Sequence, residues 1–99
     1  MSEAMIDIQA HGFQPSGAFL DYVRRTVHEA AAWGRLDCRC TLHLYEVIPG
    51  TTDGVQATLA YEALGREERV TVCDSSPLVA VQTAGAELGR RLRARPAAA

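Results

Sequence analysis

The sequence predicts an α+β fold in which two helices cover one face of a four-stranded sheet. In four short segments, apolar side chains recur at every second position, as they do in half-buried strands. In two longer segments they recur at steps of three and four, as they do in amphipathic helices. The segments follow one another in the order β-α-β-β-β-α, which favours a two-layer sandwich of the α+β class.

The first strand and the first helix occupy the N-terminal third of the chain. Residues 5–10 alternate between apolar and polar side chains, which predicts a strand. Pro15 is unsuited to a helix interior, and Ser16 is a suitable N-cap, so a helix is expected to begin here. From Gly17 to about Trp33 the apolar residues follow helical spacing. We expect Gly34 to end this helix as its C′ residue.

Three further strands are expected in the middle of the chain. Residues 37–47 alternate, and the turn-forming residues 49–54 separate them from a second alternating segment at 55–64. Gly65-Arg66 then reverses the chain into a last strand around 67–73. Because these connections are short, the three strands should form an antiparallel meander.

The segment Ser76–Arg95 predicts an amphipathic helix with a basic end. Ser76 is a suitable N-cap, and Pro77 suits the first helical position. One stripe of this helix is apolar: Leu78, Val81, Gly85, Leu88 and Leu92. Four arginines crowd the far end, with no acid after Glu87: Arg90, Arg91, Arg93 and Arg95. Cations suit the negative end of the helix dipole, and these guanidinium groups can also meet a polyanion.

Length and composition are those of one soluble globular domain. We expect residues 1–99 to form a single domain with flexible tails at 1–4 and 96–99. The 47% hydrophobic and 22% charged content is ordinary, and no apolar run is long enough to cross a membrane. The N-terminus carries acids where a signal peptide carries positive charge, so a cytoplasmic location is expected. The net charge of −2 does not by itself indicate nucleic-acid binding.

Metal binding and catalysis are not predicted. Cys38-x-Cys40 lies near His43, but strand alternation places these cysteines and this histidine on opposite faces, and the spacing is not that of a zinc site. We therefore interpret Cys38 and Cys40 as small buried hydrophobes and expect no metal and no cofactor. The sequence contains no nucleophile elbow and no phosphate-binding glycine loop, and its three histidines lie on three different elements. A non-enzymatic protein is expected, with a small enzyme as a distant alternative.

The arginines are the more informative residues. Arg24 and Arg25 lie opposite the apolar stripe of the first helix and should be exposed. If the two helices pack side by side, Arg25 and the arginines of the last helix frame one electropositive, anion-binding face. The alternative is an ordinary solvated surface that Glu29 and Glu87 partly neutralise.

Three stretches of the sequence resemble a known family. They are the opening Ile6-Asp7-Ile8-Gln9-Ala10-His11, the helical Phe19-Leu20-Asp21-Tyr22-Val23 and Leu78-Val79-Ala80-Val81 of the final helix. Together with the element order, they resemble the short form of the ribosome hibernation-promoting factors, also called the sigma-54 modulation or ribosome-associated inhibitor family. The resemblance runs from Met5 to about Leu92. It implies a fold like that of double-stranded RNA-binding domains, with the first strand beside the second.

The resemblance also implies a partner and a binding mode. It implies docking in the messenger and transfer RNA channel of the small ribosomal subunit, through basic side chains that contact ribosomal RNA without reading its sequence. Arg25 and Arg90 match positions where the family tends to be basic, and Arg24, Arg91 and Arg93 are neighbours that could substitute. These five arginines are the candidate RNA-binding residues.

The sequence also departs from the family pattern. Residues 30–33 lack the lysines usual there, Glu87 occupies a position that is often basic, and Asp53 stands in a loop without positive charge. A protein-interaction module, or a homodimer formed through the open sheet face or edge, therefore remains an alternative. That face would carry Arg39, Thr41, His43, Tyr45, Gln56 and Thr58. Whether Trp33 packs inward or serves as a surface contact stays open.

Overall fold

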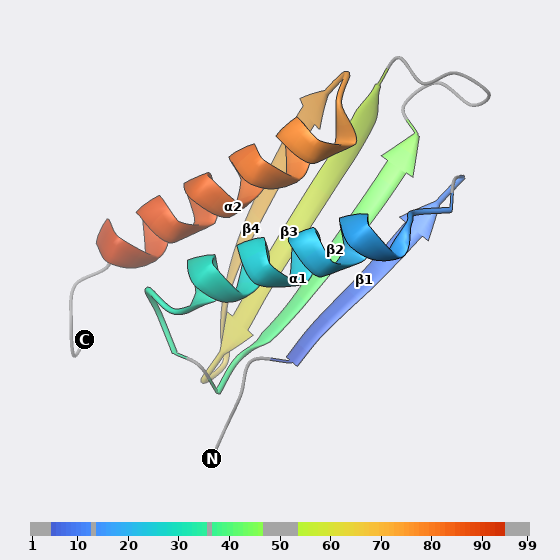
Figure 1. Cartoon of the computed structure of the whole chain (residues 1–99). Helices are drawn as coiled ribbons and strands as arrows, with labels where there is room; N and C mark the ends of the chain where they lie inside the picture. The colour runs from blue at the N-terminus through green and yellow to red at the C-terminus, as the bar shows by residue number, and fades with distance from the viewer. Residues whose placement is uncertain (1–4, 13, 36, 47–53, 95–99) are drawn as a thin grey trace.

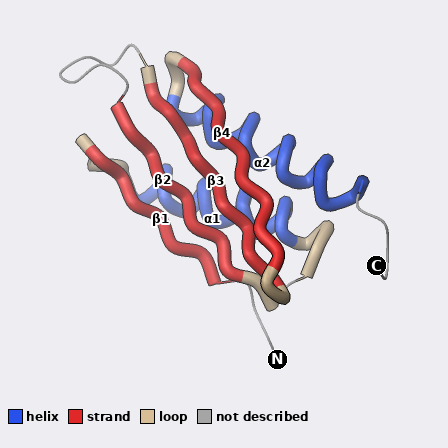
Figure 2. Tube along the Cα trace, turned by 180° about the vertical axis from the view of Figure 1, so that it is seen from behind, coloured by secondary structure: helices blue, strands red, loops and turns tan. Residues whose placement is uncertain are grey.

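The computed structural model describes residues 5–12, 14–35, 37–46 and 54–94. Its elements follow the predicted order: β1 (Met5–His11), α1 (Gly17–Ala31), β2 (Arg39–Glu46), β3 (Val55–Ala63), β4 (Arg66–Asp74) and α2 (Pro77–Ala94). The two helices lie side by side on one face of the sheet, and the opposite face carries no helix (Figures 1 and 2). The predicted α+β two-layer sandwich is confirmed. The expected tails, most of the 49–54 turn and Arg95 lie outside the described residues.

The four strands lie in the sheet in the order in which they occur in the chain. β1 pairs parallel with β2, and the remaining pairs are antiparallel. A parallel pair needs a crossover connection, which α1 supplies. Leu64 and Gly65 join β3 to β4, with φ values of 54° and 75°. Two consecutive left-handed residues are what a type I′ hairpin turn requires. The antiparallel pairs confirm the predicted meander, and the parallel pair confirms that β1 lies beside β2.

The core lies between the sheet and the helix layer. β2 places Cys40, Leu42 and Leu44 on its inner face, each at most 1% exposed, as the alternation predicted. Tyr61 of β3 and Leu88 of α2 are among the largest fully buried side chains. None of the polar or charged residues that the structure describes is buried. The polar side chains therefore lie on the outer sheet face and on the exposed sides of the helices.

Both helices begin where the sequence placed their caps. The Ser16 hydroxyl accepts a hydrogen bond of 3.1 Å from the backbone N–H of Phe19, and the Ser76 hydroxyl accepts one of 3.3 Å from that of Val79. Each cap satisfies one N–H group that the first turn leaves unpaired. No helix among the described residues is long and apolar enough to span a membrane.

The predicted end of α1 is wrong by two residues, and Gly34 does not act as the expected C′ glycine. The helix ends at Ala31, and among the described glycines only Gly12 and Gly65 have positive φ. Gly34 is instead where the chain passes closely over Tyr61. A Cβ atom at Gly34 would lie 2.6 Å from Tyr61 Oη, which accepts a hydrogen bond of 2.8 Å from the backbone N–H of Arg35. The missing side chain therefore permits this contact with a buried tyrosine.

Candidate functional site

A groove of about 480 Å³ runs between α1 and α2 on the helix face. The helices run in the same direction, so their C-terminal ends lie at the same end of the molecule (Figure 1). Small residues form much of the groove, among them Ala30, Gly85 and Gly89. A Cβ atom at Gly85 would lie only 2.8 Å from Cγ2 of Thr26, so the glycine lets the two helices approach closely. The result is a shallow channel bordered by longer side chains.

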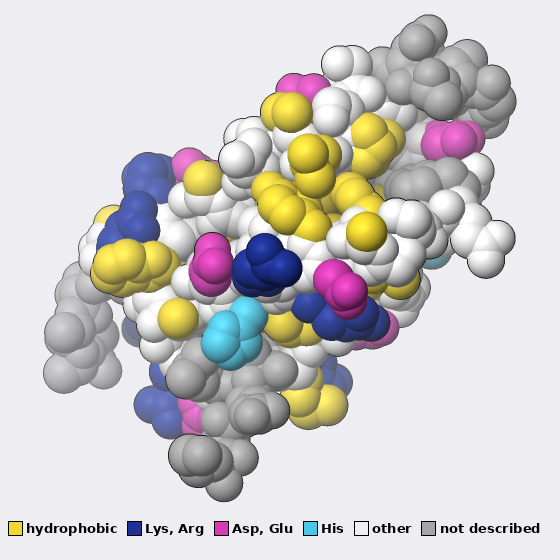
Figure 3. Space-filling model, in the orientation of Figure 1, with side chains coloured by type: hydrophobic (Ala, Val, Ile, Leu, Met, Phe, Trp, Pro, Cys, Tyr) yellow, Lys and Arg dark blue, Asp and Glu magenta, His cyan; other side chains and the backbone are white. Residues whose placement is uncertain are grey.

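Arg25 of α1 and Arg93 of α2 both line this groove. The structure thus brings together two of the five candidate arginines from different elements. Arg25 forms no ion pair with another described residue within 4.0 Å. Glu29 also lines the groove, so its charge is mixed. Figure 3 shows basic side chains of the helix face as separate groups with acidic side chains beside them.

Arg90 and Arg91 share a single carboxylate. Glu87 accepts hydrogen bonds from Nε of Arg90 at 2.9 Å and from Nε of Arg91 at 2.8 Å. The hydrogen bonds from Arg90 and then from Arg91 lower the pKa of Glu87 to about 2. Arg91 also donates a hydrogen bond of 2.9 Å to the carbonyl of Arg69 on β4. Both arginines are therefore partly neutralised, and Arg91 is tied to the edge of the sheet.

Arg24 lies apart from the groove. Its guanidinium is exposed and lies 3.9 Å from the carboxylate of Asp21, one turn earlier on α1. Arg24 and Arg25 are both exposed, as predicted, but neighbouring positions of a helix point in different directions. The five candidate arginines thus form three groups rather than one continuous patch.

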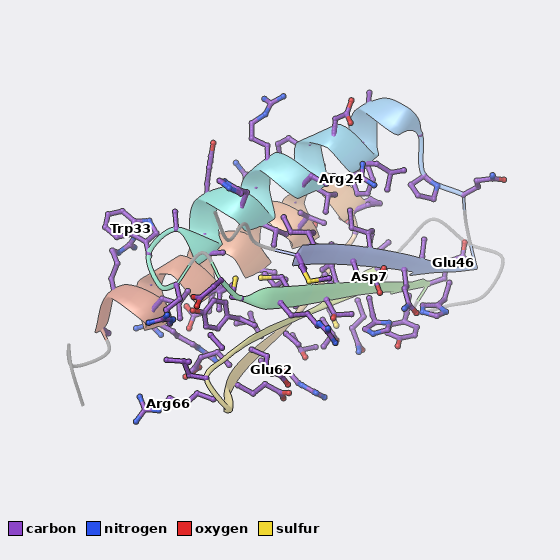
Figure 4. The ribbon with its side chains drawn as sticks, turned by 90° about the horizontal axis from the view of Figure 1, so that it is seen from below. Asp7, Arg24, Trp33, Glu46, Glu62 and Arg66 are labelled. Atoms are coloured by element: carbon purple, nitrogen blue, oxygen red, sulfur yellow. The ribbon has the colours of Figure 1, made fainter. Side chains whose placement is uncertain are left out.

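Trp33 lies just beyond the end of α1, near the C-terminal end of α2 (Figure 4). It is 57% exposed, which shows that it is a surface residue rather than part of the core. The Arg93 guanidinium carbon lies 4.6 Å from the centroid of the Trp33 ring, a cation–π contact. Both residues line the groove, so an aromatic ring and a cation meet at one end of it.

The outer sheet face holds a cluster that sequence reasoning missed. The rings of His11 and Tyr45 stack with centroids 4.6 Å apart, and Nε2 of His11 lies 3.3 Å from Nδ1 of His43. A hydrogen bond at this distance requires one of the two nitrogens to carry the proton and the other to accept it. The register that pairs His11 with Tyr45 across parallel strands creates the cluster. Among the described residues, no group of three potential metal ligands gathers.

Cys38 and Cys40 lie where the strand alternation placed them. Cys38 and Cys40 are buried on the inner face with their sulfur atoms 3.9 Å apart, whereas Cys73 is exposed. Burial, and secondarily the neighbouring Cys38, raises the pKa of the Cys40 thiol to about 12. Thiols in this environment stay protonated at neutral pH and pack as small apolar groups.

The fold is similar to two solved structures from bacteria. The first is the N-terminal domain of Thermus thermophilus Protein Y, with a TM-score of 0.72 and 17% sequence identity over 94% of this chain and 97% of that one. The second is a ribosomal subunit interface protein from Coxiella burnetii, with a TM-score of 0.72 and 10% identity over 89% and 92% of the two chains. No family model and no curated protein sequence matches the chain. The fold expected from the family resemblance is confirmed.

Proposed function

We propose that this protein is a non-enzymatic, ribosome-associated translation inhibitor that binds the small ribosomal subunit through its RNA. The observation that supports this most strongly is the placement of the candidate arginines. All five lie on the two helices, Arg24 and Arg25 on α1 and the others on α2. The fold of nearly the whole chain is shared with proteins named for the ribosome interface and as Protein Y. A factor that occupies the messenger and transfer RNA channel would block initiation and protect idle subunits.

The binding would be electrostatic and limited in strength. Each arginine that contacts a phosphate contributes about 0.7–0.9 to the slope of log affinity against log salt. Arg25 and Arg93 line the groove and can reach a phosphate chain that follows it. Arg90 and Arg91 contribute less, since Glu87 accepts hydrogen bonds from both of them. We therefore expect binding at low salt that declines steeply as salt is added.

The outer sheet face favours a second candidate function, a protein-interaction or self-association surface. This face holds an open pocket of about 730 Å³. Its charges are mixed: Arg39 and Arg69 lie there together with Glu62 and Glu67. A surface of both signs suits a protein partner better than a polyanion. Light scattering over a range of protein concentrations would detect self-association as a rise in mean mass.

Co-sedimentation with purified small ribosomal subunits at two salt concentrations tests the first proposal. We expect the wild-type protein to sediment with subunits at low salt and to be released at high salt. Replacing Arg25 and Arg93 with Glu should abolish binding. The matched control replaces Arg39 and Arg66, which lie on β2 and β4, with Glu and should retain it. No wild-type binding at low salt would overturn the proposed function, and equal loss in both double variants would overturn the assignment to the helix face.

A further inference from the structure

We propose that Trp33, held by Arg93, is a stacking site for an unpaired RNA base at the end of the groove between the helices. This inference rests on the proposed function and names the form of RNA that the helix face takes. It requires a ring that is fixed in position, has one face open to solvent and lies beside cations.

The position of Trp33 is fixed on several sides. Its backbone N–H donates a hydrogen bond of 3.2 Å to the carbonyl of Ala30, which ties the residue to the end of α1. Its Cδ1 lies 3.4 Å from where a Cβ atom of Gly89 would be, so the ring edge rests on the backbone of α2. The Arg93 guanidinium covers one face of the ring at 4.6 Å. Contacts from both helices therefore orient the indole before any ligand arrives.

The remaining surface of the ring is available for binding. With one face under Arg93 and 57% of the residue exposed, the opposite face of the indole meets solvent. Figure 4 shows Trp33 at the end of the helix layer, on the side of the sheet that carries α1 and α2. A large apolar side chain left in water gains little for folding, because most of its surface stays hydrated. Stacking a second planar ring on this face would remove that surface from water.

The chemistry of the site favours a single-stranded nucleic acid. An unpaired base offers a planar face of the right size, whereas a continuous duplex hides its base faces within the stack. Arg93 stays on the far side of the indole, so a base, the indole and the guanidinium would form a three-layer stack. Arg25 lines the same groove and is placed to meet the phosphates that follow the stacked base. Since the ring is already ordered, stacking costs little conformational entropy.

Trp33 is the only tryptophan in the chain, so its intrinsic fluorescence reports on this site alone. We would titrate the protein with a short single-stranded oligoadenylate at low salt and, separately, with a blunt RNA duplex of the same length. The expected result is saturable quenching by the single strand, with much weaker quenching by the duplex. Unchanged fluorescence with the single strand, or equal quenching by both, would overturn the inference.

Variants separate stacking from charge. Fluorescence anisotropy of labelled oligoadenylate should show binding that is about 5- to 150-fold weaker for Trp33→Leu. Trp33→Phe keeps an aromatic ring and should recover part of this loss, which a merely structural role for the side chain would not predict. Equal affinity of wild type and Trp33→Leu would overturn the stacking site.

The same variants distinguish the failure of this inference from that of the proposed function. If wild type and Trp33→Leu sediment equally well with small subunits, the stacking site is overturned while ribosome binding stands. If the wild type does not sediment with subunits at all, the proposed function is overturned, and oligoadenylate quenching alone decides whether Trp33 stacks on RNA.

Discussion

Nε of Arg91 lies 2.8 Å from Oε2 of Glu87, the same carboxylate group that Arg90 contacts. Glu87 therefore offsets one of the two positive charges, and the carboxylate of Glu68 lies 4.0 Å from Nη1 of Arg91. Glu87 restrains both side chains as well as neutralising them. This arrangement determines how much of the basic end of α2 is available to a polyanion.

Glu87→Gln should therefore strengthen binding to small subunits. Removing the carboxylate charge releases Arg90 toward phosphates, whereas Arg91 keeps its hydrogen bond to the carbonyl of Arg69. One additional phosphate contact would steepen the salt dependence by about 0.7–0.9 in log–log slope. Co-sedimentation at several salt concentrations measures both quantities. Glu67→Gln is the matched control, since Glu67 pairs with Arg69 on β4 at 3.1 Å, away from the helix groove. A similar gain in both variants would show that only net charge matters.

Glu87 should also contribute an acid-sensitive part of the stability. Its pKa is lowered from 4.5 to about 2 by the hydrogen bonds from Arg90 and Arg91. A carboxyl whose pKa is lower in the folded state stabilises the fold above its unfolded pKa, and this contribution disappears as pH falls through the folded value. The difference in unfolding free energy between wild type and Glu87→Gln should therefore shrink from pH 4.5 to pH 2. Urea unfolding at a series of pH values measures it, and a constant difference would contradict the assignment.

Two glycines of α2 should respond oppositely to replacement by alanine. At Gly89 the new Cβ would meet Trp33 Cδ1 at 3.4 Å, an ordinary contact, so the better helix propensity should stabilise the protein by about 1 kcal/mol. At Gly85 it would lie 2.8 Å from Cγ2 of Thr26, a β-branched side chain with little rotamer freedom. Gly85→Ala should therefore destabilise the protein despite the same gain in propensity. Thermal unfolding followed by circular dichroism compares the two, and equal midpoints would argue against close helix packing.

The three cysteines should differ in reactivity in the native protein. Cys73 is exposed, whereas Cys38 and Cys40 are buried and burial raises the pKa of both thiols. Because the thiolate is the reactive form, a maleimide should modify Cys73 first and the other two only upon unfolding. Mass spectrometry of the native and urea-treated protein counts the modified thiols. Rapid modification of all three without denaturant would show that the inner face of β2 is accessible.

Two sequence predictions that failed in detail concern the end of α1. The run Ala30-Ala31-Ala32 favours a helix throughout, so local propensity gave no sign that the helix stops at Ala31. The stop coincides with the passage of Gly34 over Tyr61, a residue of β3 that is 27 positions later in the chain. A contact over that separation leaves no periodic signal near the helix end.

The sequence by itself determined the element order, the caps of both helices and the face on which each strand residue lies. These are local properties: alternation, helical spacing and capping depend on a few neighbouring residues. Among the described residues, the structure follows them everywhere except at the end of α1. It also showed that the five candidate arginines belong to the two helices. What it left open was which of them act together.

Only the tertiary structure decided which side chains from different elements meet. The register of two parallel strands joins His11 to His43, and the close packing of two helices brings Trp33 to Arg93. The same packing places Arg25 and Arg93 on one groove and leaves Arg24 outside it. Such contacts depend on strand register and interhelical distance, which buried side chains set collectively. Because no single segment encodes these quantities, no periodicity in the sequence could reveal them.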